Sequence, residues 1–123
     1  MKIKLTNDRL NLIANTKGAY IEEFSRDGKD VFFPKFETEI SGKKKTRGGS
    51  HPCLPSFGPS EINELKDHGY GRDNEWNLVE KSDNKAVLNL GGKCGYEGVD
   101  SFISYELNEN HLEAEIKMVN NSD

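Results

Sequence analysis

Several features that define whole classes of protein are missing from this 123-residue chain. It has no run approaching the ~18 apolar residues that a membrane-spanning helix needs. Its first stretch, Met1 to Leu12, alternates charged and apolar residues and lacks the apolar core of a secretory signal. Its two cysteines, Cys53 and Cys94, form no C-x-x-C pair. We therefore expect no membrane partner, and free thiols in the reducing cytoplasm.

An excess of positive charge is also absent, since the formal net charge is −4. Proteins that coat nucleic acid are usually basic, so we expect no nucleic-acid partner. One local basic run, Lys43 to Lys45 with Arg47, stands out, but no aromatic residues lie between its cations as they do in single-strand binding surfaces. We interpret this run as a solvated hairpin tip, and attraction of a phosphate group is the alternative.

Helical periodicity is scarce as well, because apolar residues recur at every second position in most of the chain. Asp27-Gly28 and Asn108 to Asn110 are typical of hairpin turns. One helical turn is predicted at Ser60 to Lys66. The predicted strands cover residues 3–5, 10–14, 19–24, 31–33, 36–40, 76–80, 86–90, 99–107 and 112–120. Short strands at this spacing predict an all-β protein, an antiparallel β-sandwich, in one domain spanning residues 1–123.

The last two predicted strands are the most regular. One face of the first carries Val99, Ile103, Tyr105 and Leu107, and one face of the second carries Leu112, Ala114, Ile116 and Met118. With a hydrophobic fraction of 33%, the chain is polar for its length. We therefore expect that its exposed sheet edges need a partner chain to cover them.

The segment from Arg47 to Trp76 is the richest in chemistry. It holds two of the three histidines, three of the four prolines and five of the twelve glycines, so it is too irregular for a strand or a helix. Ordering such a loop costs about 1–2 kcal/mol per residue in backbone entropy. Long ordered loops on a rigid scaffold usually serve binding or catalysis. This segment is therefore the predicted site.

Two motifs in this segment resemble the aldose 1-epimerase (galactose mutarotase-like) family. Residues 47–49 (RGG) with 52–58 (PCLPSFG) resemble a run found in the branch that includes hexose-6-phosphate epimerases. Residues 68–72 (HGYGR), followed by Trp76, resemble a second family motif. Flanking stretches extend the likeness over nearly all of this sequence, but only over the amino-terminal half of the family's domain.

The resemblance implies half of a galactose mutarotase-like supersandwich and an enzyme that interconverts the α and β anomers of an aldohexose or a hexose 6-phosphate. In this reaction a base removes the proton of the C1 hydroxyl while an acid protonates the ring oxygen. The family's acid, a second histidine, and its base, a glutamate, come after the part that matches. We therefore expect them outside this chain, and little activity from the chain alone.

The resemblance also implies roles for His68, Arg47 and Arg72, and aromatic stacking suggests one for Phe57. His68 is the candidate catalytic residue, in contact with the sugar ring oxygen or a neighbouring hydroxyl. Arg47 and Arg72, together with His68, are candidate substrate-binding residues, because a guanidinium grips hydroxyls or a phosphate through paired N–H donors. Phe57 is the candidate for stacking on the apolar face of the sugar.

Simpler interpretations of these residues remain open. The motif favours a functional role for both, but His68 is also consistent with an ordinary surface histidine, and Arg72 with an ion pair to Asp73 or Glu75. Phe57, like Trp76, fits a place in the core. The histidines and cysteines have no zinc-binding spacing, so we predict no metal. The resemblance implies that no organic cofactor is needed either.

The function itself has two interpretations. The first is the epimerase half described above, with a small-molecule sugar or sugar phosphate as its partner. The second is a non-catalytic carbohydrate-binding module that holds sugar hydroxyls through the same loop without transferring protons. The sequence leaves open a homo-oligomer and a missing carboxy-terminal half, and it does not say which sugar is bound.

Overall fold

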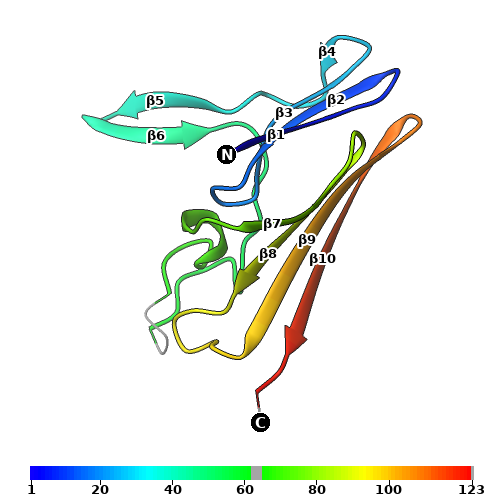
Figure 1. Ribbon diagram of the computed structural model, residues 1–123. Coiled ribbons are helices and arrows are strands. Elements are labelled where there is room, and N and C mark those ends of the chain that lie inside the picture. Colours follow the sequence, from blue (N-terminus) through cyan, green and yellow to red (C-terminus); the bar gives the residue numbers. More distant parts are fainter. Residues whose placement is uncertain (62–64, 123) are drawn as a thin grey trace.

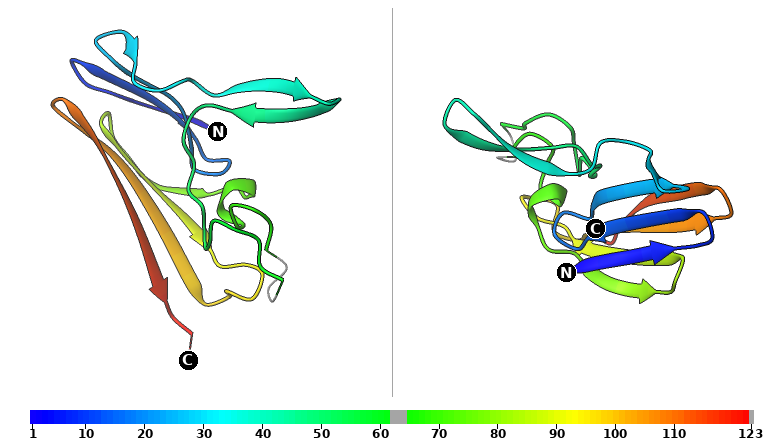
Figure 2. Two further views of the ribbon diagram at one scale, coloured as in Figure 1. Left: turned by 180° about the vertical axis from the view of Figure 1, so that it is seen from behind. Right: turned by 90° about the horizontal axis from the view of Figure 1, so that it is seen from above.

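The computed structural model describes residues 1–61 and 65–122, which form antiparallel β-strands and one short 3-10 helix (Figure 1). Two four-stranded sheets pack face to face, and a separate two-stranded hairpin projects from them (Figure 2). The predicted all-β antiparallel sandwich is therefore confirmed.

The first sheet comes from the start of the chain. Its strands, in spatial order, are β1 (Lys2–Thr6), β2 (Leu10–Asn15), β3 (Tyr20–Arg26) and β4 (Lys29–Asp30). Successive side chains of a strand point to opposite faces, so Ile3 and Leu5 are buried while Lys2 and Lys4 are exposed. The predicted Asp27-Gly28 turn joins β3 to β4.

The second sheet comes from the end of the chain. Its strands are β7 (Asn77–Lys81), β8 (Lys85–Gly91), β9 (Val99–Asn108) and β10 (His111–Asn120), in the order β10-β9-β8-β7. The β9–β10 hairpin turns within the predicted residues 108–110, although Asn108 still belongs to β9, and all its paired positions follow one uninterrupted register. The prediction of a hairpin at this position is confirmed.

The core lies between the two sheets. Its most buried side chains include Leu5 and Leu12 of the first sheet and Leu88 and Leu107 of the second. The Tyr105 hydroxyl of β9 donates a hydrogen bond to the Ala19 carbonyl across the interface, at 2.5 Å. Burial raises the pKa of Tyr105 well above its ordinary value, so this hydroxyl keeps its proton.

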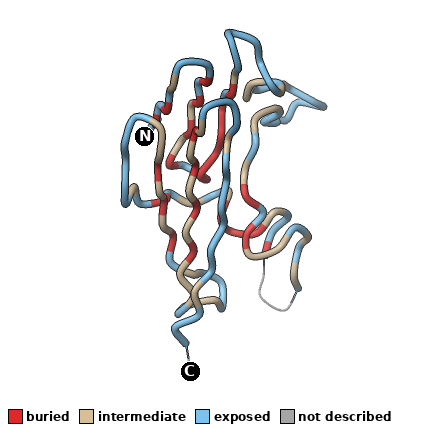
Figure 3. Tube along the Cα trace, turned by 90° about the vertical axis from the view of Figure 1, so that its right-hand side faces the viewer, coloured by how far each residue is buried: buried red, intermediate tan, exposed pale blue. Residues whose placement is uncertain are grey.

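Strand β10 is exposed along most of its length (Figure 3). Leu112, Ala114, Ile116 and Met118 share one face, as predicted, and they pair with residues of β9 that point into the core. Leu112 packs against the core, whereas Ile116 and Met118 are 52% and 45% exposed. The covering sheet therefore does not extend over all of β10.

Two predicted elements turned out differently. Residues 31–33, predicted as a strand, lie beyond the end of β4. Residues 43–47, predicted as part of a long loop, form β6 (Lys43–Arg47), which pairs with β5 (Phe36–Ile40). Every residue of β6 is polar and exposed, so no apolar alternation marks it. The helical turn predicted at residues 60–66 falls on residues 62–64, which lie outside the described residues.

Candidate functional site

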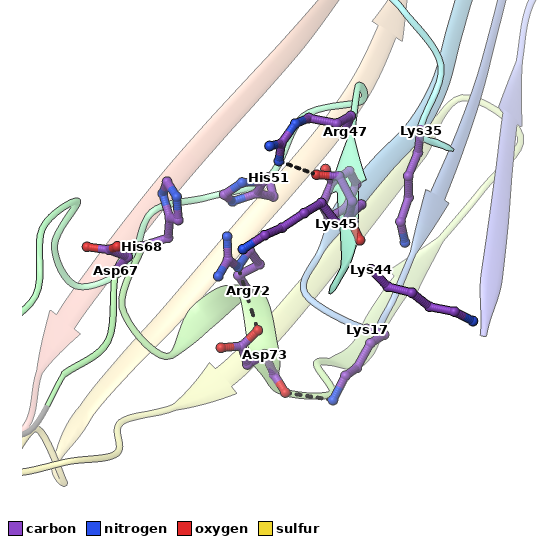
Figure 4. A pocket seen from close by; sticks show the side chains of 12 residues that line it. Lys17, Lys35, Lys44, Lys45, Arg47, His51, Asp67, His68, Arg72 and Asp73 are labelled. Carbon is purple, nitrogen blue, oxygen red and sulfur yellow. Dashed lines mark hydrogen bonds and ion pairs between the residues drawn. The ribbon is translucent and has the colours of Figure 1, made fainter. Parts of the chain in front are cut away.

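A cleft of about 490 Å³ lies at the base of the β5–β6 hairpin (Figure 4). Its walls come from β6, from the start of β3 and from the segment after β6. Arg47, His68 and Arg72, which the sequence singled out, all line it. Three side chains spread over 26 positions of an irregular segment therefore meet in one hollow.

The segment is attached to the core through Leu54, which is buried. The Leu54 N–H donates to the His68 carbonyl at 3.2 Å, and the Gly71 N–H donates to the Leu54 carbonyl at 3.0 Å. The His68 N–H in turn donates to the Phe57 carbonyl at 2.6 Å. These backbone bonds fix His68 and the 3-10 helix η1 (Gly71–Asp73), which carries Arg72.

Gly69 allows the backbone on either side of it to pass very close to the backbone at Leu54. A Cβ atom on Gly69 would lie 2.0 Å from the Leu54 carbonyl oxygen, and the Gly69 φ is +67°. No side chain fits there, so glycine is required at this position. His68 also has a positive φ, +68°, a conformation that is uncommon for residues other than glycine but in which histidine is enriched.

Four rings stand in a row beside the cleft. The ring centroids of Tyr20 and His51 are 5.2 Å apart, those of His51 and His68 are 5.1 Å apart, and those of His68 and Phe57 are 5.2 Å apart. The two contacts of His68 are edge-on. This row holds both imidazoles side by side at the cleft.

Phe57 occupies an unexpected place in this row. Its side chain is 73% exposed, so it is not a core residue, and it is not among the residues that line the cleft. Its ring packs edge-on against His68 instead. The predicted stacking of Phe57 on a sugar stays a prediction.

Positive charge dominates the cleft, although the whole chain is acidic. Six cationic side chains line the cleft against two carboxylates, Asp67 and Asp73. Among the described residues, no carboxylate pairs with Lys44, Lys45 or Arg47 of β6. The basic run interpreted as a solvated hairpin tip is exposed, as expected, but it also contributes to one wall of this cleft.

The cations on the opposite wall have partners. The Arg72 Nε lies 3.6 Å from the Asp73 carboxylate, which is the ion pair that the sequence left open. The Lys17 Nζ donates to the Asp73 carbonyl at 2.6 Å. The Lys35 Nζ lies 3.2 Å from Glu22 and 4.6 Å from the centre of the Tyr20 ring. These contacts hold the cations in place rather than leaving them free in solvent.

Glu22 organises this wall from just behind it. Burial alone would raise the pKa of Glu22, but hydrogen bonds from Asn15, Lys2 and Lys35 outweigh burial and lower it. Glu22 therefore stays ionised and holds Lys35. Burial raises the pKa of Tyr20 above its ordinary value, so its hydroxyl stays protonated and donates to the Gly48 carbonyl at 2.8 Å.

His51 is a half-buried residue of the cleft to which the sequence analysis gave no role. Desolvation is the largest effect on the pKa of His51 and lowers it, although the hydrogen bond with the Pro52 backbone opposes it. The nearby charges of Arg72 and His68 lower this pKa by smaller amounts, and Asp73 raises it least. At neutral pH this ring is therefore uncharged. Its Nδ1 lies 3.2 Å from the Pro52 carbonyl oxygen.

The thiol of Cys53 lies beside His68. The Cys53 Sγ is 3.3 Å from the His68 Nδ1, and the cysteine is free and exposed. This contact occupies one ring nitrogen of His68 and leaves the other, Nε2, for a ligand. Across the described residues, no group of three or more metal-ligating side chains occurs, and no helix is long and apolar enough to cross a membrane.

Much of the cleft was missed by sequence reasoning. Lys17, Tyr20 and Lys35 come from segments outside the predicted loop, and no motif marked them. The signals that existed were the basic run of β6 and His51, which stands inside the singled-out segment. Trp76, in contrast, is buried, and its Nε1 donates to the Gly71 carbonyl at 2.9 Å behind the cleft.

Comparison with known proteins supports the fold. No family model matches the sequence, and no curated protein matches it at a significant level. Among solved structures, a candidate aldose 1-epimerase from Escherichia coli K12 is 19% identical, with a TM-score of 0.69 over 98% of this chain and 46% of that one. A galactose mutarotase related enzyme from Lactobacillus acidophilus is 15% identical, with a TM-score of 0.70 over 100% of this chain and 44% of that one.

A third solved structure, a galactose mutarotase-like protein from Lactobacillus casei, is 13% identical, with a TM-score of 0.69 over 98% of this chain and 44% of that one. At these identities the likeness establishes a shared fold. The chain spans about half the length of each of these three structures.

Proposed function

We propose that this chain is the sugar-binding half of an aldose 1-epimerase-like enzyme, which interconverts the α and β anomers of an aldohexose or a hexose 6-phosphate. The observation that carries the proposal is the meeting of Arg47, His68 and Arg72 in one cleft. The mutarotase-like fold of the structural neighbours supports the same substrate class.

The geometry suggests how a sugar would lie. Arg47 on one wall and Arg72 on the other present guanidinium N–H groups, which pair well with vicinal hydroxyls or with a phosphate. His68 belongs to the loop and lines the cleft, and one of its ring nitrogens contacts Cys53. Its second nitrogen would meet the ring oxygen or a neighbouring hydroxyl. Phe57, packed on His68, would extend this surface.

The charge of the cleft favours the phosphorylated substrate. Lys44, Lys45 and Arg47 are exposed on β6 and have no described carboxylate partner, so a ligand need not displace an ion pair to reach them. A phosphate dianion has the charge and the acceptor oxygens that such a cluster binds. A neutral hexose would gain little from these three cations.

Binding tests this proposal directly. Titrate the ¹⁵N-labelled chain with glucose 6-phosphate, glucose and inorganic phosphate, and follow amide shifts by NMR. We expect glucose 6-phosphate to bind more tightly than glucose and to shift the amides around His68. Arg47→Ala should weaken binding roughly tenfold to a hundredfold, because a hydrogen bond to a charged group contributes about 1.5–3 kcal/mol.

A matched pair of double variants removes two positive charges, either at the cleft or away from it. Lys44→Ala/Lys45→Ala should weaken binding of glucose 6-phosphate, whereas Lys4→Ala/Lys29→Ala, on exposed parts of β1 and β4, should not. Equal affinity for glucose and glucose 6-phosphate would show that the cleft does not recognise the phosphate group. Absence of binding by any sugar would reject the site.

Activity separates the proposed half-enzyme from a binder. The acid and base of the reaction are expected outside these residues, so the chain alone should exchange anomers no faster than buffer. Polarimetry or exchange NMR on glucose, galactose and glucose 6-phosphate measures this rate. A rate well above buffer would contradict the expected absence of the acid and base.

The second candidate function is a non-catalytic carbohydrate-binding module. The observation that favours it is the cation-rich lining of the cleft, which can hold sugar hydroxyls or a phosphate without any proton transfer. The two candidates differ when the chain is supplied with a carboxy-terminal half of a structural neighbour. Restored anomer exchange supports the enzyme, and unchanged binding without exchange supports the module.

A further inference from the structure

The cleft contains a second imidazole, that of His51, next to the imidazole of His68. The two ring centroids are 5.1 Å apart, and both residues line the cleft (Figure 4). His51 is half-buried, and among the described residues it takes part in no ion pair. Charge pairing therefore does not explain its place in the cleft.

The backbone around His51 is anchored to the sandwich. Just before it, Ser50 forms a bridge with Ile21 of β3. The Ile21 N–H donates to the Ser50 carbonyl at 2.7 Å, and the Ser50 N–H donates to the Ile21 carbonyl at 2.9 Å. Just after it, Pro52 is buried. His51 is thus carried by a segment that is held on both sides, although it lies outside the strands.

The ring of His51 is held as well. The Tyr20 ring packs against it with the centroids 5.2 Å apart, and the His68 ring packs against it edge-on. Tyr20 is itself fixed, because its hydroxyl donates to the Gly48 carbonyl and the Lys35 Nζ lies over its ring. The imidazole therefore has a defined orientation before a ligand binds, which lowers the entropic cost of binding.

One hydrogen bond decides which nitrogen of His51 carries the proton. The Nδ1 lies 3.2 Å from the Pro52 carbonyl oxygen, and a carbonyl only accepts, so Nδ1 is the donor. Burial lowers the pKa of His51, so the ring is neutral at pH 7 and Nε2 carries a lone pair. No described residue bonds to Nε2, and the buried side-chain atoms without a partner are two others, on Tyr70 and Ser101. Nε2 is thus an acceptor that a ligand can reach.

Such an acceptor is scarce in this cleft. The six cationic side chains that line it only donate, since lysine and arginine have no acceptor. The acceptors on Thr46, Asp67 and Asp73 are exposed, so water competes for them. Of the two imidazoles, His51 is the one whose proton is fixed by a backbone carbonyl. Its Nε2 is therefore a half-buried acceptor with a defined lone pair.

An acceptor suits a hydroxyl and does not suit a phosphate. A sugar hydroxyl has a proton to donate, and it loses water partners when it enters the cleft, so it needs an acceptor there. A phosphate dianion has only acceptors, which the lone pair of Nε2 repels. The cations of β6 and the Nε2 of His51 therefore suit different parts of one ligand.

We propose that His51 is a substrate-binding residue that accepts a hydrogen bond from one sugar hydroxyl through Nε2, and that this contact sets which sugars the cleft prefers. The inference rests on the proposed function, because it needs a sugar in the cleft. The guanidinium groups hold a ligand through its oxygen atoms, whereas Nε2 requires a proton on the ligand. A derivative without that hydroxyl leaves Nε2 unpaired, and a site built to bond a hydroxyl discriminates against such a derivative.

A cycle of variants and deoxy sugars tests the proposal. Calorimetry measures the affinity of the full chain for glucose 6-phosphate and for its 1-, 2-, 3- and 4-deoxy derivatives, at about pH 8, where the phosphate is a dianion. Loss of one of these hydroxyls should weaken binding to the parent chain about threefold to tenfold through Nε2. His51→Phe keeps a flat ring without an acceptor. It should weaken binding of glucose 6-phosphate by the same factor and abolish the discrimination against that one derivative.

Three controls separate a lost hydrogen bond from a distorted cleft. His51→Gln supplies an amide oxygen that can accept in place of Nε2, and it should recover most of the affinity that His51→Phe loses. His111→Phe, at the exposed start of β10, should bind like the parent chain. Inorganic phosphate should bind equally to the parent chain and to His51→Phe, because the dianion has no proton to donate.

The outcomes distinguish this inference from the proposed function. A parent chain that binds none of the sugars rejects the proposed function, and the role of His51 with it. If the parent chain binds glucose 6-phosphate but His51→Phe leaves the discrimination against all four derivatives unchanged, His51 contacts no hydroxyl. The inference is then overturned while the proposed function stands. Weaker binding of inorganic phosphate to His51→Phe overturns it too, because the variant then acts by distorting the cleft.

Discussion

Two hairpins of this protein, β9–β10 and β5–β6, are both regular antiparallel ladders without a bulge, yet they serve different purposes. In β9, alternate residues enter the core, including Ile103 and Leu107. In β5–β6, nearly every residue is exposed, and the hairpin stands away from the sandwich. Pairing forms the strand in both cases, but only burial ties a strand to the stability of the fold. The exposed hairpin leaves its cations available to a ligand.

The β5–β6 hairpin is held at its base. The Tyr20 hydroxyl donates to the Gly48 carbonyl, the Lys35 N–H donates to the Glu22 carbonyl at 2.7 Å, and the Gly49 N–H donates to the Phe33 carbonyl at 2.7 Å. These contacts fix the wall of the cleft where it joins β3. The tip has no such contacts to the sandwich among the described residues, so local opening should begin there.

The largest difference between the hairpins should appear on truncating an isoleucine in each. Ile103→Ala removes a buried side chain of β9 and should lower the free energy of unfolding by about 2–5 kcal/mol. Ile40→Ala removes a half-exposed side chain of β5 and should change it by less than about 0.5 kcal/mol. Urea denaturation of both variants measures this. Equal losses would show that β5–β6 is part of the cooperative core.

A smaller difference should appear on removing one hydroxyl from each region. Tyr105→Phe breaks the bond that joins the two sheets and leaves the Ala19 carbonyl without this donor, at a cost of about 1–3 kcal/mol. Tyr20→Phe breaks the bond to Gly48 at the hairpin base, which water can replace, so it should cost less than about 1 kcal/mol. Thermal unfolding of the two variants compares them, and the reverse order would contradict this assignment.

Acid should weaken the attachment of the hairpin through Glu22. The pKa of Glu22 is lowered in the folded state, so its contribution to stability is present above the unfolded pKa of about 4.3 and is lost as pH falls through the folded value. Glu22→Gln should cost about 1 kcal/mol at pH 7, and its difference from the parent chain should vanish at low pH. Glu37→Gln, on exposed β5, is the control and should differ little at either pH. A Glu22→Gln deficit that persists at pH 2 would exclude this ionisation as its cause.

The smallest effect concerns His51, at the junction of the two regions. Its pKa is lowered mainly by desolvation, so protonation opposes folding, and stability should fall slightly as pH drops below about 6.5. The imidazole proton resonances of His51 measure its pKa by NMR. A midpoint above 6.5 would mean that the junction is open to water, and that the hairpin base is less closed than the structure indicates.

The sequence predicted the parts of the fold that alternate between apolar and polar residues. β1 and β9 were found because Ile3, Leu5, Ile103 and Leu107 stand at every second position and are buried in the structure. β6 was missed because Lys43 to Lys45 carry no such alternation, and only pairing with β5 makes them a strand. Apolar–polar alternation arises where one face of a strand is buried, so a fully exposed hairpin does not show it.

The sequence predicted the residues that one segment contributes to the candidate site, but not those that the folding of the sheets brings to it. Arg47, His68 and Arg72 belong to the single segment that the sequence singled out, and the structure brings them together, with Arg47 at the end of β6. Lys17 reaches the same cleft from the turn between β2 and β3, and Lys35 from the connection between β4 and β5. Their position depends on sheet packing and on Glu22, which no local pattern encodes. Sequence reasoning therefore identified the segment but not the electrostatic character of the cleft.

Trp76 gives this architecture a built-in optical reporter. It is the only tryptophan in the chain, it is 2% exposed, and its indole N–H is bonded to Gly71, the residue before Arg72. Emission from the chain on excitation at the red edge of its absorption thus arises from a single fluorophore directly behind the wall of the cleft. Occupation of the cleft and loss of the core should each change its spectrum, without a label and without altering a residue.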